Sequence, residues 1–345
     1  MRDMEYICEA DFIPWDRLKN KMILITGATG LIGYTLVNAL LYANKERALN
    51  LKVLALVRDK DRATERFKAH IDDASLSLIH GCVEELPRIG QAVDYIVHGA
   101  SQTASKAFVL QPVETIITAL KGTENLLELA RRKAVSGMVY LSSMEVYGNP
   151  EKGHKIKEDE FGALTPLDVR NSYPISKMQC ESLCCAYARE YSVPVMMIRL
   201  TQTFGPGVNY NDGRVFAEFA RCVVEKRDIV LKTKGEAERS YLYTADAATA
   251  ILTVLLKGEA GQVYNAANES TYCSIAEMAE KVATQGGIKV RYEIEEESKN
   301  GYSKTLYMNL DTSLLQQLGW RWKKICLTEM FKILTNEFKV KYLII

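Results

Sequence analysis

Tyr173 and Lys177 stand in the segment YPISK, at a spacing that could support acid–base chemistry. Residues four positions apart on a helix share a face, so the lysine ammonium would lie beside the phenol. A nearby positive charge lowers the pKa of a phenol, and the resulting phenolate can take a proton from a hydroxyl group. The pattern is common by chance, so it gains weight only from chemistry elsewhere in the chain.

A second candidate segment is SSMEVYG, residues 142–148, which follows an apolar run. Ser143 supplies a hydroxyl and Glu145 a carboxylate at the expected end of a buried strand. Met144 lies between them and has no proton to donate. The segment could therefore hydrogen-bond a substrate oxygen without supplying an acid at position 144. A purely structural role for Glu145 as a hydrogen-bond acceptor is the alternative.

The segment TGATGLIG, residues 26–33, places Gly27, Gly30 and Gly33 at G-x-x-G-x-x-G spacing. The first glycine permits a tight turn, the second lets backbone approach a pyrophosphate, and the third lets helix and strand pack closely. The helix N-terminus then offers free N–H groups and a positive dipole to phosphates. Because the motif follows a buried strand and opens a helix, it predicts a bound dinucleotide rather than an ordinary turn.

The end of the second strand bears on the choice between NAD and NADP, because an acid there binds the ribose 2′-hydroxyl of NAD. The sequence at this point is Val57-Arg58-Asp59. Arg58 can accommodate a 2′-phosphate, which slightly favours NADP. Asp59 could still turn in, and a solvated surface role for Arg58 stays open. The predicted cofactor is therefore NAD or NADP.

Strands and helices alternate around these motifs, which predicts an α/β fold, a Rossmann-type doubly wound parallel sheet. The predicted strands are residues 21–26, 52–57, 76–79, 94–98, 137–142 and 195–200. The predicted helices are one that ends near residue 42, one at 112–133 and one at 172–191. Each motif thus falls where a strand ends or a helix begins.

After Gly205 the pattern breaks into shorter pieces. We expect residues 1–205 to form the dinucleotide-binding domain with the catalytic residues, and 206–345 to form a smaller, discontinuous α/β substrate-binding region. The smaller region is expected to contain the segments 228–232, 244–257, 262–266 and 274–284.

Composition excludes several classes of function. A net charge of +1 argues against general binding of nucleic acid or acidic lipid. No apolar run reaches the ~18–20 residues of a membrane span. The acidic, mixed N-terminus is unlike a signal peptide, and eight unpaired-looking cysteines are typical of reduced thiols, so a cytoplasmic location is expected. Cys180 and Cys184 share a helical face but lack further ligands nearby, so no metal site is expected.

The chain resembles the extended short-chain dehydrogenase/reductases, the nucleotide-sugar epimerase/dehydratase family. The likeness runs from TGATGLIG through SSMEVYG and YPISK to RLTQTFGPG, RSYLYTADAA and VYNAANE, and so covers nearly the whole chain. It implies that Ser143, Tyr173 and Lys177 act together, with Ser143 hydrogen-bonding the oxygen that is oxidised. It also implies a nucleotide-sugar substrate, and a homodimer paired through the helices at 112–133 and 172–191.

The resemblance further implies contacts to cofactor and substrate. The implied cofactor contacts are Gly27, Thr29, Gly30, Leu31, Ile32, Gly33, Arg58, Cys82, Val83, Ala100, Tyr173 and Lys177. The implied substrate contacts are Ser143, Arg170, Gln202, Arg214 and Arg239, with Arg239 as the natural phosphate ligand. A surface ion pair is the alternative for Arg239. The chain departs from the family at Cys82, where Asp is common, and at Ala119 and Gln202, where Asn is common.

Position 144 separates the reactions of this family. The 4,6-dehydratase branch has Thr-Asp-Glu where this chain has Ser143-Met144-Glu145, and its Asp protonates the departing hydroxyl. A 4-epimerase usually needs neither carboxylate. The UDP-glucuronate decarboxylase branch has a Glu but no Asp here, and Arg170 and the segment NDGRV containing Arg214 also resemble that branch. Decarboxylation through a transient 4-keto sugar, with the cofactor tightly bound and regenerated, is therefore favoured over epimerisation and dehydration.

A non-catalytic NAD(P)-binding sensor is the competing hypothesis from another class. The departures at Cys82, Ala119 and Met144 would support it. The intact set of Tyr173 and Lys177 argues against it, because a sensor has no need of a phenolate base.

Overall fold

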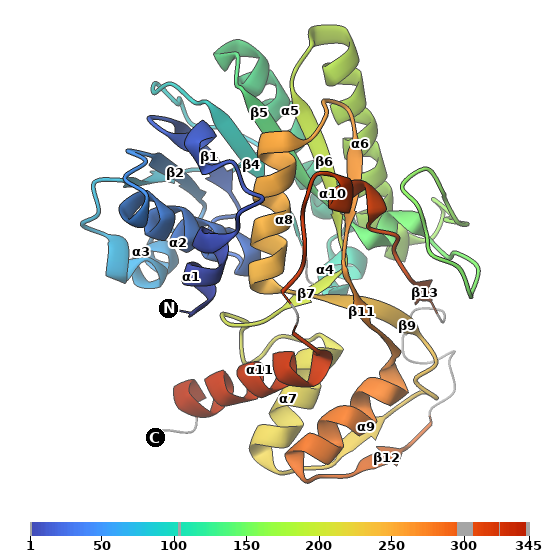
Figure 1. The fold of residues 1–345 in the computed structure, drawn as a ribbon. Helices are drawn as coiled ribbons and strands as arrows, with labels where there is room; N and C mark the ends of the chain where they lie inside the picture. Colours follow the sequence, from blue (N-terminus) through green and yellow to red (C-terminus); the bar gives the residue numbers. More distant parts are fainter. Residues whose placement is uncertain (1, 103–104, 295–305, 324, 343–345) are drawn as a thin grey trace.

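The structure is a computed structural model that describes residues 2–102, 105–294, 306–323 and 325–342 (Figure 1). Its centre is a seven-stranded sheet in which every neighbouring pair of strands is parallel. Across the sheet the order is β10 (Val263–Ala266), β6 (Val195–Leu200), β5 (Gly137–Ser143), β4 (Tyr95–His98), β1 (Met22–Thr26), β2 (Lys52–Val57) and β3 (Leu76–His80). The predicted Rossmann-type doubly wound fold is confirmed.

Both faces of this sheet are buried, which explains why its strands are continuous apolar runs. Successive side chains of a strand point to opposite faces. In β1, Ile23 and Ile25 join one hydrophobic cluster while Leu24 joins another. In β5, Val139 joins the first cluster and Tyr140 the second. The sheet therefore separates two cores, one on each side.

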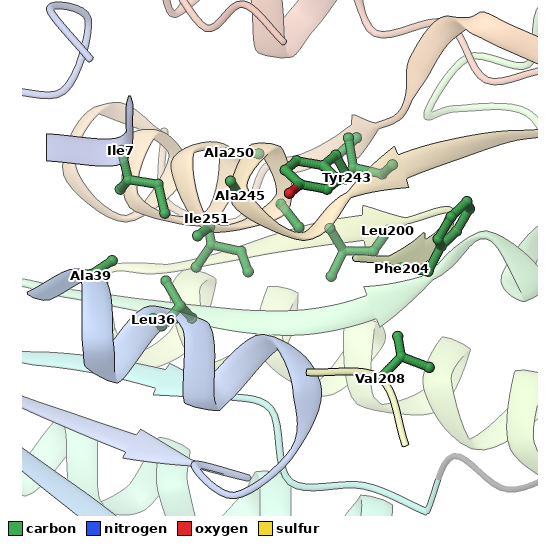
Figure 2. Packing of buried hydrophobic residues seen from close by; sticks show 14 of the residues in the cluster. Ile7, Leu36, Ala39, Leu200, Phe204, Val208, Tyr243, Ala245, Ala250 and Ile251 are labelled. Atoms are coloured by element: carbon green, nitrogen blue, oxygen red, sulfur yellow. The ribbon is translucent and has the colours of Figure 1, made fainter. Parts of the chain in front are cut away.

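Helices cover each face. The first face carries α1 (Arg2–Glu9), α2 (Leu31–Glu46), α3 (Lys60–Arg66) and α8 (Thr244–Lys257), and the second carries α5 (Pro112–Lys133) and α6 (Ser172–Tyr191). Figure 2 shows Leu36 and Ala39 of α2 pointing toward Ile251 of α8, with Ile7 of α1 close by. Helix α2 extends four residues beyond the predicted end near residue 42.

A smaller group of elements lies at one end of the main sheet (Figure 1). Strand β9 (Glu238–Tyr243) pairs with β7 (Gln202–Phe204), β11 (Asn268–Ser274) and β13 (Tyr307–Met308), and β8 (Ile229–Leu231) pairs with β12 (Val290–Tyr292). Helices α7 (Val215–Glu225), α9 (Ile275–Gly286) and α11 (Leu327–Tyr342) pack against one another beside these strands. The remaining short elements are α4 (Ser105–Leu110), α10 (Ser313–Gln317) and four 3₁₀ turns, η1 (Trp15–Leu18), η2 (Lys68–His70), η3 (Met144–Tyr147) and η4 (Val169–Asn171).

Two segments that are predicted in the smaller region lie with the main sheet, one as a strand of it and one as a helix that covers it. Strand β10, predicted as residues 262–266, pairs with β6, and α8 packs on β5 and β6. A short apolar strand has the same pattern whichever sheet it joins, so its place depends on which strand edge is free to pair. The division of the chain at residue 205 stays a prediction.

Within the described part of the chain, no helix is long and apolar enough to cross a lipid bilayer.

Candidate active site

The end of β5 and the start of α6 bring together the side chains of YPISK and SSMEVYG. Ser143 is the last residue of β5, and its Oγ accepts a hydrogen bond from the Glu145 backbone N–H at 3.2 Å. This bond caps the 3₁₀ turn η3, which reverses the chain directly after the strand. Ser143 and Glu145 both influence the pKa of the Tyr173 phenol, so the three side chains share one site.

Lys177 lies one helical turn below Tyr173 on α6 and is buried, with 3% of the residue exposed. Its Nζ donates to the Leu141 carbonyl oxygen at 2.7 Å. Its Nζ also lies 4.7 Å from the centre of the Tyr140 ring and 5.6 Å from that of Tyr173. Burial lowers the pKa of Lys177 to about 8, because the ammonium has lost most of its water.

Tyr173 is 8% exposed, and its ring stacks on that of Phe108 in α4, with centroids 4.4 Å and planes 4° apart. Burial raises the pKa of Tyr173, and the Glu145 carboxylate raises it further, while Ser143 and Arg214 act in the opposite direction. The spacing of Tyr173 and Lys177 in the sequence predicts a lowered pKa for this phenol. Burial and Glu145 have the opposite effect because they disfavour the phenolate, so the expected lowering would have to come from the Lys177 ammonium together with the cofactor's positive charge.

Glu145 stands between two of the predicted substrate arginines. Burial raises the pKa of its carboxyl group, and Arg170 and Arg239 partly oppose that rise. Arg170 comes from η4, directly before α6, and its guanidinium lies 5.3 Å over the Phe108 ring. Arg239 comes from β9, and its Nε is buried without a hydrogen-bond partner among the described residues. Two positive side chains distant in the sequence thus approach one carboxylate.

The surroundings of Arg214 and Gln202 support a substrate-binding role less strongly than those of Arg170 and Arg239. Arg214 lies close enough to Tyr173 to lower its pKa, but its guanidinium forms an ion pair with Asp212 at 2.7 Å. That pair offsets much of its charge. Gln202 is the first residue of β7 and is half-buried opposite Tyr241 of β9.

Met144 turns its side chain away from any solvent and is buried. Its Sδ accepts a hydrogen bond from Thr201 Oγ1 at 3.2 Å. It belongs to a small apolar cluster with Val146, Tyr147 and Leu310. Position 144 therefore has no acidic group, and its surroundings are apolar apart from the Thr201 hydroxyl.

The glycine loop has the geometry that a pyrophosphate requires. Gly27 has φ +69°, and a Cβ there would lie 2.7 Å from backbone atoms of Gly99. A Cβ on Gly33 would lie 2.3 Å from the Gly27 carbonyl oxygen, because α2 starts immediately beside the loop. No side chain caps the N-terminus of α2 at Gly30. The first N–H groups of the helix therefore remain available to an anion, which fits a bound dinucleotide.

Other predicted cofactor residues border this loop. Thr29, Leu31 and Ile32 are half-buried at the start of α2. Ala100 follows β4, and its N–H donates to Thr26 Oγ1 at 3.1 Å, which links the ends of β4 and β1. These positions lie at the carboxyl ends of β1 and β4, the side of an open α/β sheet where ligands bind.

The end of β2 presents Arg58 to solvent, while Asp59 is engaged elsewhere. Asp59 Oδ1 accepts a hydrogen bond from the Arg62 N–H at 2.9 Å and so caps α3. Cys82 is half-buried beyond β3, and Val83 beside it is buried against Gly122 of α5. Arg58 is therefore the freer of the two charged side chains at the strand end.

Sequence reasoning missed Phe108 and Tyr140, whose rings flank Tyr173 and Lys177. Both are buried and stand in apolar segments, where a core aromatic and a site aromatic look the same. It also missed His98, whose Nδ1 lies 2.7 Å from Thr26 Oγ1 below the glycine loop. A polar residue at the end of an apolar strand was the signal that could have found it.

Comparisons with known proteins agree with this architecture. A sequence profile of the NAD dependent epimerase/dehydratase family matches residues 23–267. A UDP-glucuronic acid decarboxylase 1 of Xenopus tropicalis is 30% identical over 269 residues, which are 77% of this chain and 61% of that protein. The match thus spans less than two thirds of that relative. UDP-glucuronic acid decarboxylase 6 of Arabidopsis thaliana is 28% identical over 93% of this chain and 90% of that protein.

Among solved structures, a UDP-glucuronic acid 4-epimerase from Bacillus cereus, in complex with UDP-glucuronic acid and NAD, superimposes with a TM-score of 0.78. The superposition covers 93% of this chain and all of that one, at 19% identity, so it supports the fold alone. The profile match covers well over half of the sequence. The chain therefore belongs to the NAD dependent epimerase/dehydratase family, the nucleotide-sugar-modifying extended short-chain dehydrogenase/reductases that its motifs resemble.

Proposed function

We propose that this protein decarboxylates a nucleotide-linked hexuronic acid such as UDP-glucuronate through a transient 4-keto sugar. The glycine loop and the free N-terminus of α2 would hold the pyrophosphate of NAD or NADP. When bound, that cofactor would supply a reversible hydride acceptor for oxidation at C4 of the sugar. The enzyme would then be a lyase, and its cofactor would end each cycle unchanged.

The side chains of the protein would transfer the protons and bind the negatively charged groups of the substrate. Tyr173 would take the proton of the C4 hydroxyl, with Ser143 hydrogen-bonding the same oxygen. The Lys177 ammonium would stabilise the phenolate that forms beside it. Arg170 would bind the sugar carboxylate, and Arg239 the nucleotide diphosphate. Glu145 would position the sugar ring or assist the transfer of the proton that C5 gains after CO₂ leaves.

The observation that carries this proposal is Met144. Its buried, apolar setting leaves the site without an acid between Ser143 and Glu145 to expel water. A 4-keto hexuronate is a β-keto acid and loses CO₂ without such an acid. The similarity to UDP-glucuronic acid decarboxylases from a frog and a plant supports the same reaction.

Incubation with a panel of nucleotide sugars, followed by mass spectrometry, tests the proposal. We expect UDP-glucuronate to lose the mass of CO₂ and give a nucleotide pentose. An unchanged mass with altered stereochemistry would mean epimerisation, and loss of the mass of water would mean dehydration. Either of those results contradicts the proposal.

The position of Arg58 supports use of NADP as well as NAD. Arg58 is exposed at the strand end, whereas Asp59 is held as the cap of α3. We expect Arg58→Ala to weaken NADP binding roughly tenfold while leaving NAD binding within about twofold, because only NADP carries the 2′-phosphate. Dissociation constants measured by calorimetry for both dinucleotides check this. An equal loss for both would show that Arg58 does not contact the 2′-phosphate.

We also propose a cytoplasmic homodimer. All eight cysteines are free thiols, as in proteins of reducing compartments. The helices α5 and α6 pack side by side, and α5 exposes Val113 and Ile117 on one face. Sedimentation of the wild type and of a variant with charged residues at these two positions would test the pairing.

A further inference from the structure

The Lys177 ammonium has few polar partners in its buried position. Among the described residues, the Leu141 carbonyl oxygen is the one hydrogen-bond acceptor that Nζ reaches, at 2.7 Å. An ammonium carries three N–H donors, so this bond leaves two of them without an acceptor among the described residues. Nζ also lies 4.7 Å from the centre of the ring of Tyr140, which precedes Leu141 in the same strand.

Tyr140 is held firmly where it meets the ammonium. It is 1% exposed and lies in β5, which is flanked by β4 and β6. Its ring packs in the core beneath α5 and α6 and lies 5.6 Å from the His98 ring. Within the described chain its hydroxyl makes no hydrogen bond. What Tyr140 offers to Lys177 is therefore the face of its ring.

We propose that Tyr140 is a positioning residue whose ring face holds the Lys177 ammonium in place and keeps it charged beside Tyr173. The face of an aromatic ring is electronegative, and its attraction for a cation is largest where water is excluded. Burial alone would favour the neutral amine. The inference rests on the proposed function, in which a charged Lys177 acts on the Tyr173 phenol.

Among the neighbours that the structure describes, none supplies an uncompensated negative charge. The titratable groups facing Lys177 are Tyr173, Cys180, Glu181 and Cys184 on α6, His98 on β4 and Tyr140 on β5. Glu181 is committed to Arg199 through hydrogen bonds of 2.9 and 2.7 Å. Burial lowers the pKa of His98 to about 3 and raises that of Cys184, so both groups stay neutral near pH 7.

A series of ring substitutions tests the proposal without changing the size of the core. Position 140 would carry phenylalanine (Tyr140→Phe) and then phenylalanine analogues with one, two and three ring fluorines, which weaken the ring's attraction for cations stepwise. The titration of Lys177 would be followed by NMR of protein labelled with ε-¹³C-lysine, its signal being the one that Lys177→Met removes. Thermal unfolding would confirm that each variant is folded.

We expect Tyr140→Phe to titrate as the wild type does, because it keeps the ring and loses only an unpaired hydroxyl. Each added fluorine should lower the midpoint, and the trifluorinated variant should lie about one pH unit below Tyr140→Phe. A midpoint that is constant across the series would overturn the proposal. So would a shift in Tyr140→Phe as large as that of the trifluorinated variant, because the hydroxyl would then be responsible.

The titration requires no sugar substrate, so it is independent of the proposed reaction. If the midpoint follows the fluorine count while no nucleotide sugar is converted, the role of Tyr140 stands and the proposed reaction fails. If UDP-glucuronate is decarboxylated while the midpoint stays constant, the reaction stands and the role of Tyr140 is overturned. Where both hold, the pH profile of turnover should shift with the same series.

Discussion

At the proposed base, burial and the nearby Glu145 charge both raise the pKa of the Tyr173 phenol. Tyr173 is enclosed by Phe108 and lies near the Glu145 carboxylate, and both surroundings disfavour the phenolate. The opposing help from Ser143 and Arg214 is smaller. A phenol in this setting would stay protonated until the cofactor's positive charge is added to that of Lys177. Proton removal would therefore be coupled to cofactor binding, and the Tyr173 phenol would stay neutral while the cofactor is absent.

Tyr173→Phe tests the role of this phenol. The ring would still stack on Phe108, so the fold should be kept, but the proton acceptor is lost. We expect turnover of the nucleotide sugar to fall by at least about 100-fold, with dinucleotide binding little changed. Steady-state kinetics and calorimetry measure the two effects.

Tyr191→Phe is the matched control, since Tyr191 is the last residue of the same helix and is largely exposed. It should keep wild-type turnover. If Tyr173→Phe kept it as well, the protein would not use a phenolate, and the non-catalytic sensor hypothesis would gain support.

Met144 offers a second test at the scale of one residue. Met144→Asp would place a carboxyl group in an apolar cluster whose polar contact is the Thr201 hydroxyl. We expect it to lower the free energy of unfolding by about 3 kcal/mol or more. Met144→Leu, which keeps the volume, should cost less than about 1.5 kcal/mol. Urea unfolding measures both, and a stable Met144→Asp variant that eliminates water would contradict our view of this position.

At the scale of the element, the site depends on where strands stop and helices start. The parallel strands β1, β4 and β5 have their carboxyl ends on the same side of the sheet. The Thr26 hydroxyl links the ends of β1 and β4 by accepting a hydrogen bond from the Ala100 N–H. Helix α2 begins directly after β1, and α6 passes the end of β5. Because these elements are rigid, the cofactor loop and the proposed base keep a fixed relation.

Gly33→Ala tests this arrangement. The added Cβ would lie 2.3 Å from the Gly27 carbonyl oxygen, so α2 must move away from the loop. We expect the dissociation constant for NAD to rise on the order of tenfold or more, with lower stability. Gly90→Ala is the control, because nothing lies within 4 Å of its added Cβ. Calorimetry and thermal unfolding measure the outcome, and normal NAD binding by Gly33→Ala would show that the close approach is unnecessary.

At the scale of the whole molecule, a buried carboxyl group joins three distant segments. Asp246 at the start of α8 accepts hydrogen bonds from the Tyr6 hydroxyl of α1, at 2.8 Å, and from the Lys323 N–H, at 2.7 Å. Tyr243 donates to Asp3 of α1 at 2.6 Å in the same place. These contacts attach the N-terminal helix and a segment near the C-terminus to the Rossmann sheet.

Asp246 also predicts how stability depends on pH. Burial raises the pKa of this carboxyl group from 3.8 to about 7. The unfolded chain therefore loses the proton near pH 4, while the folded protein holds it until about pH 7. The contribution of this group to stability should fall as pH rises from about 4 to 7, by a few kcal/mol, and then level off.

Asp246→Asn should remove that slope, because an amide oxygen keeps both hydrogen bonds and does not titrate. Urea unfolding at a series of pH values measures it. Asp11→Asn, at a largely exposed carboxylate, should leave the slope as in the wild type. An unchanged slope in Asp246→Asn would mean that other groups determine the pH dependence.

Features that depend on neighbours along the chain could be predicted from the amino-acid order. The glycine spacing requires a tight turn and a close helix, and YPISK places a phenol and an ammonium on one helical face. Apolar runs of five or six residues between helical segments determined the parallel sheet. All these signals are local because backbone geometry and burial repeat over a few residues.

The contacts between residues distant in the sequence became visible in the folded protein. Arg239 of β9 and Arg170 of η4 both lie near Glu145 in the folded protein. Met144 is buried in an apolar cluster, and β10 pairs with β6 in the main sheet. The structure also showed that Tyr140, one more apolar residue in its strand, faces an ammonium. Such contacts depend on strand pairing, helix packing and the exclusion of water around a charge. These properties belong to the assembled core, so no pattern along the chain could reveal them.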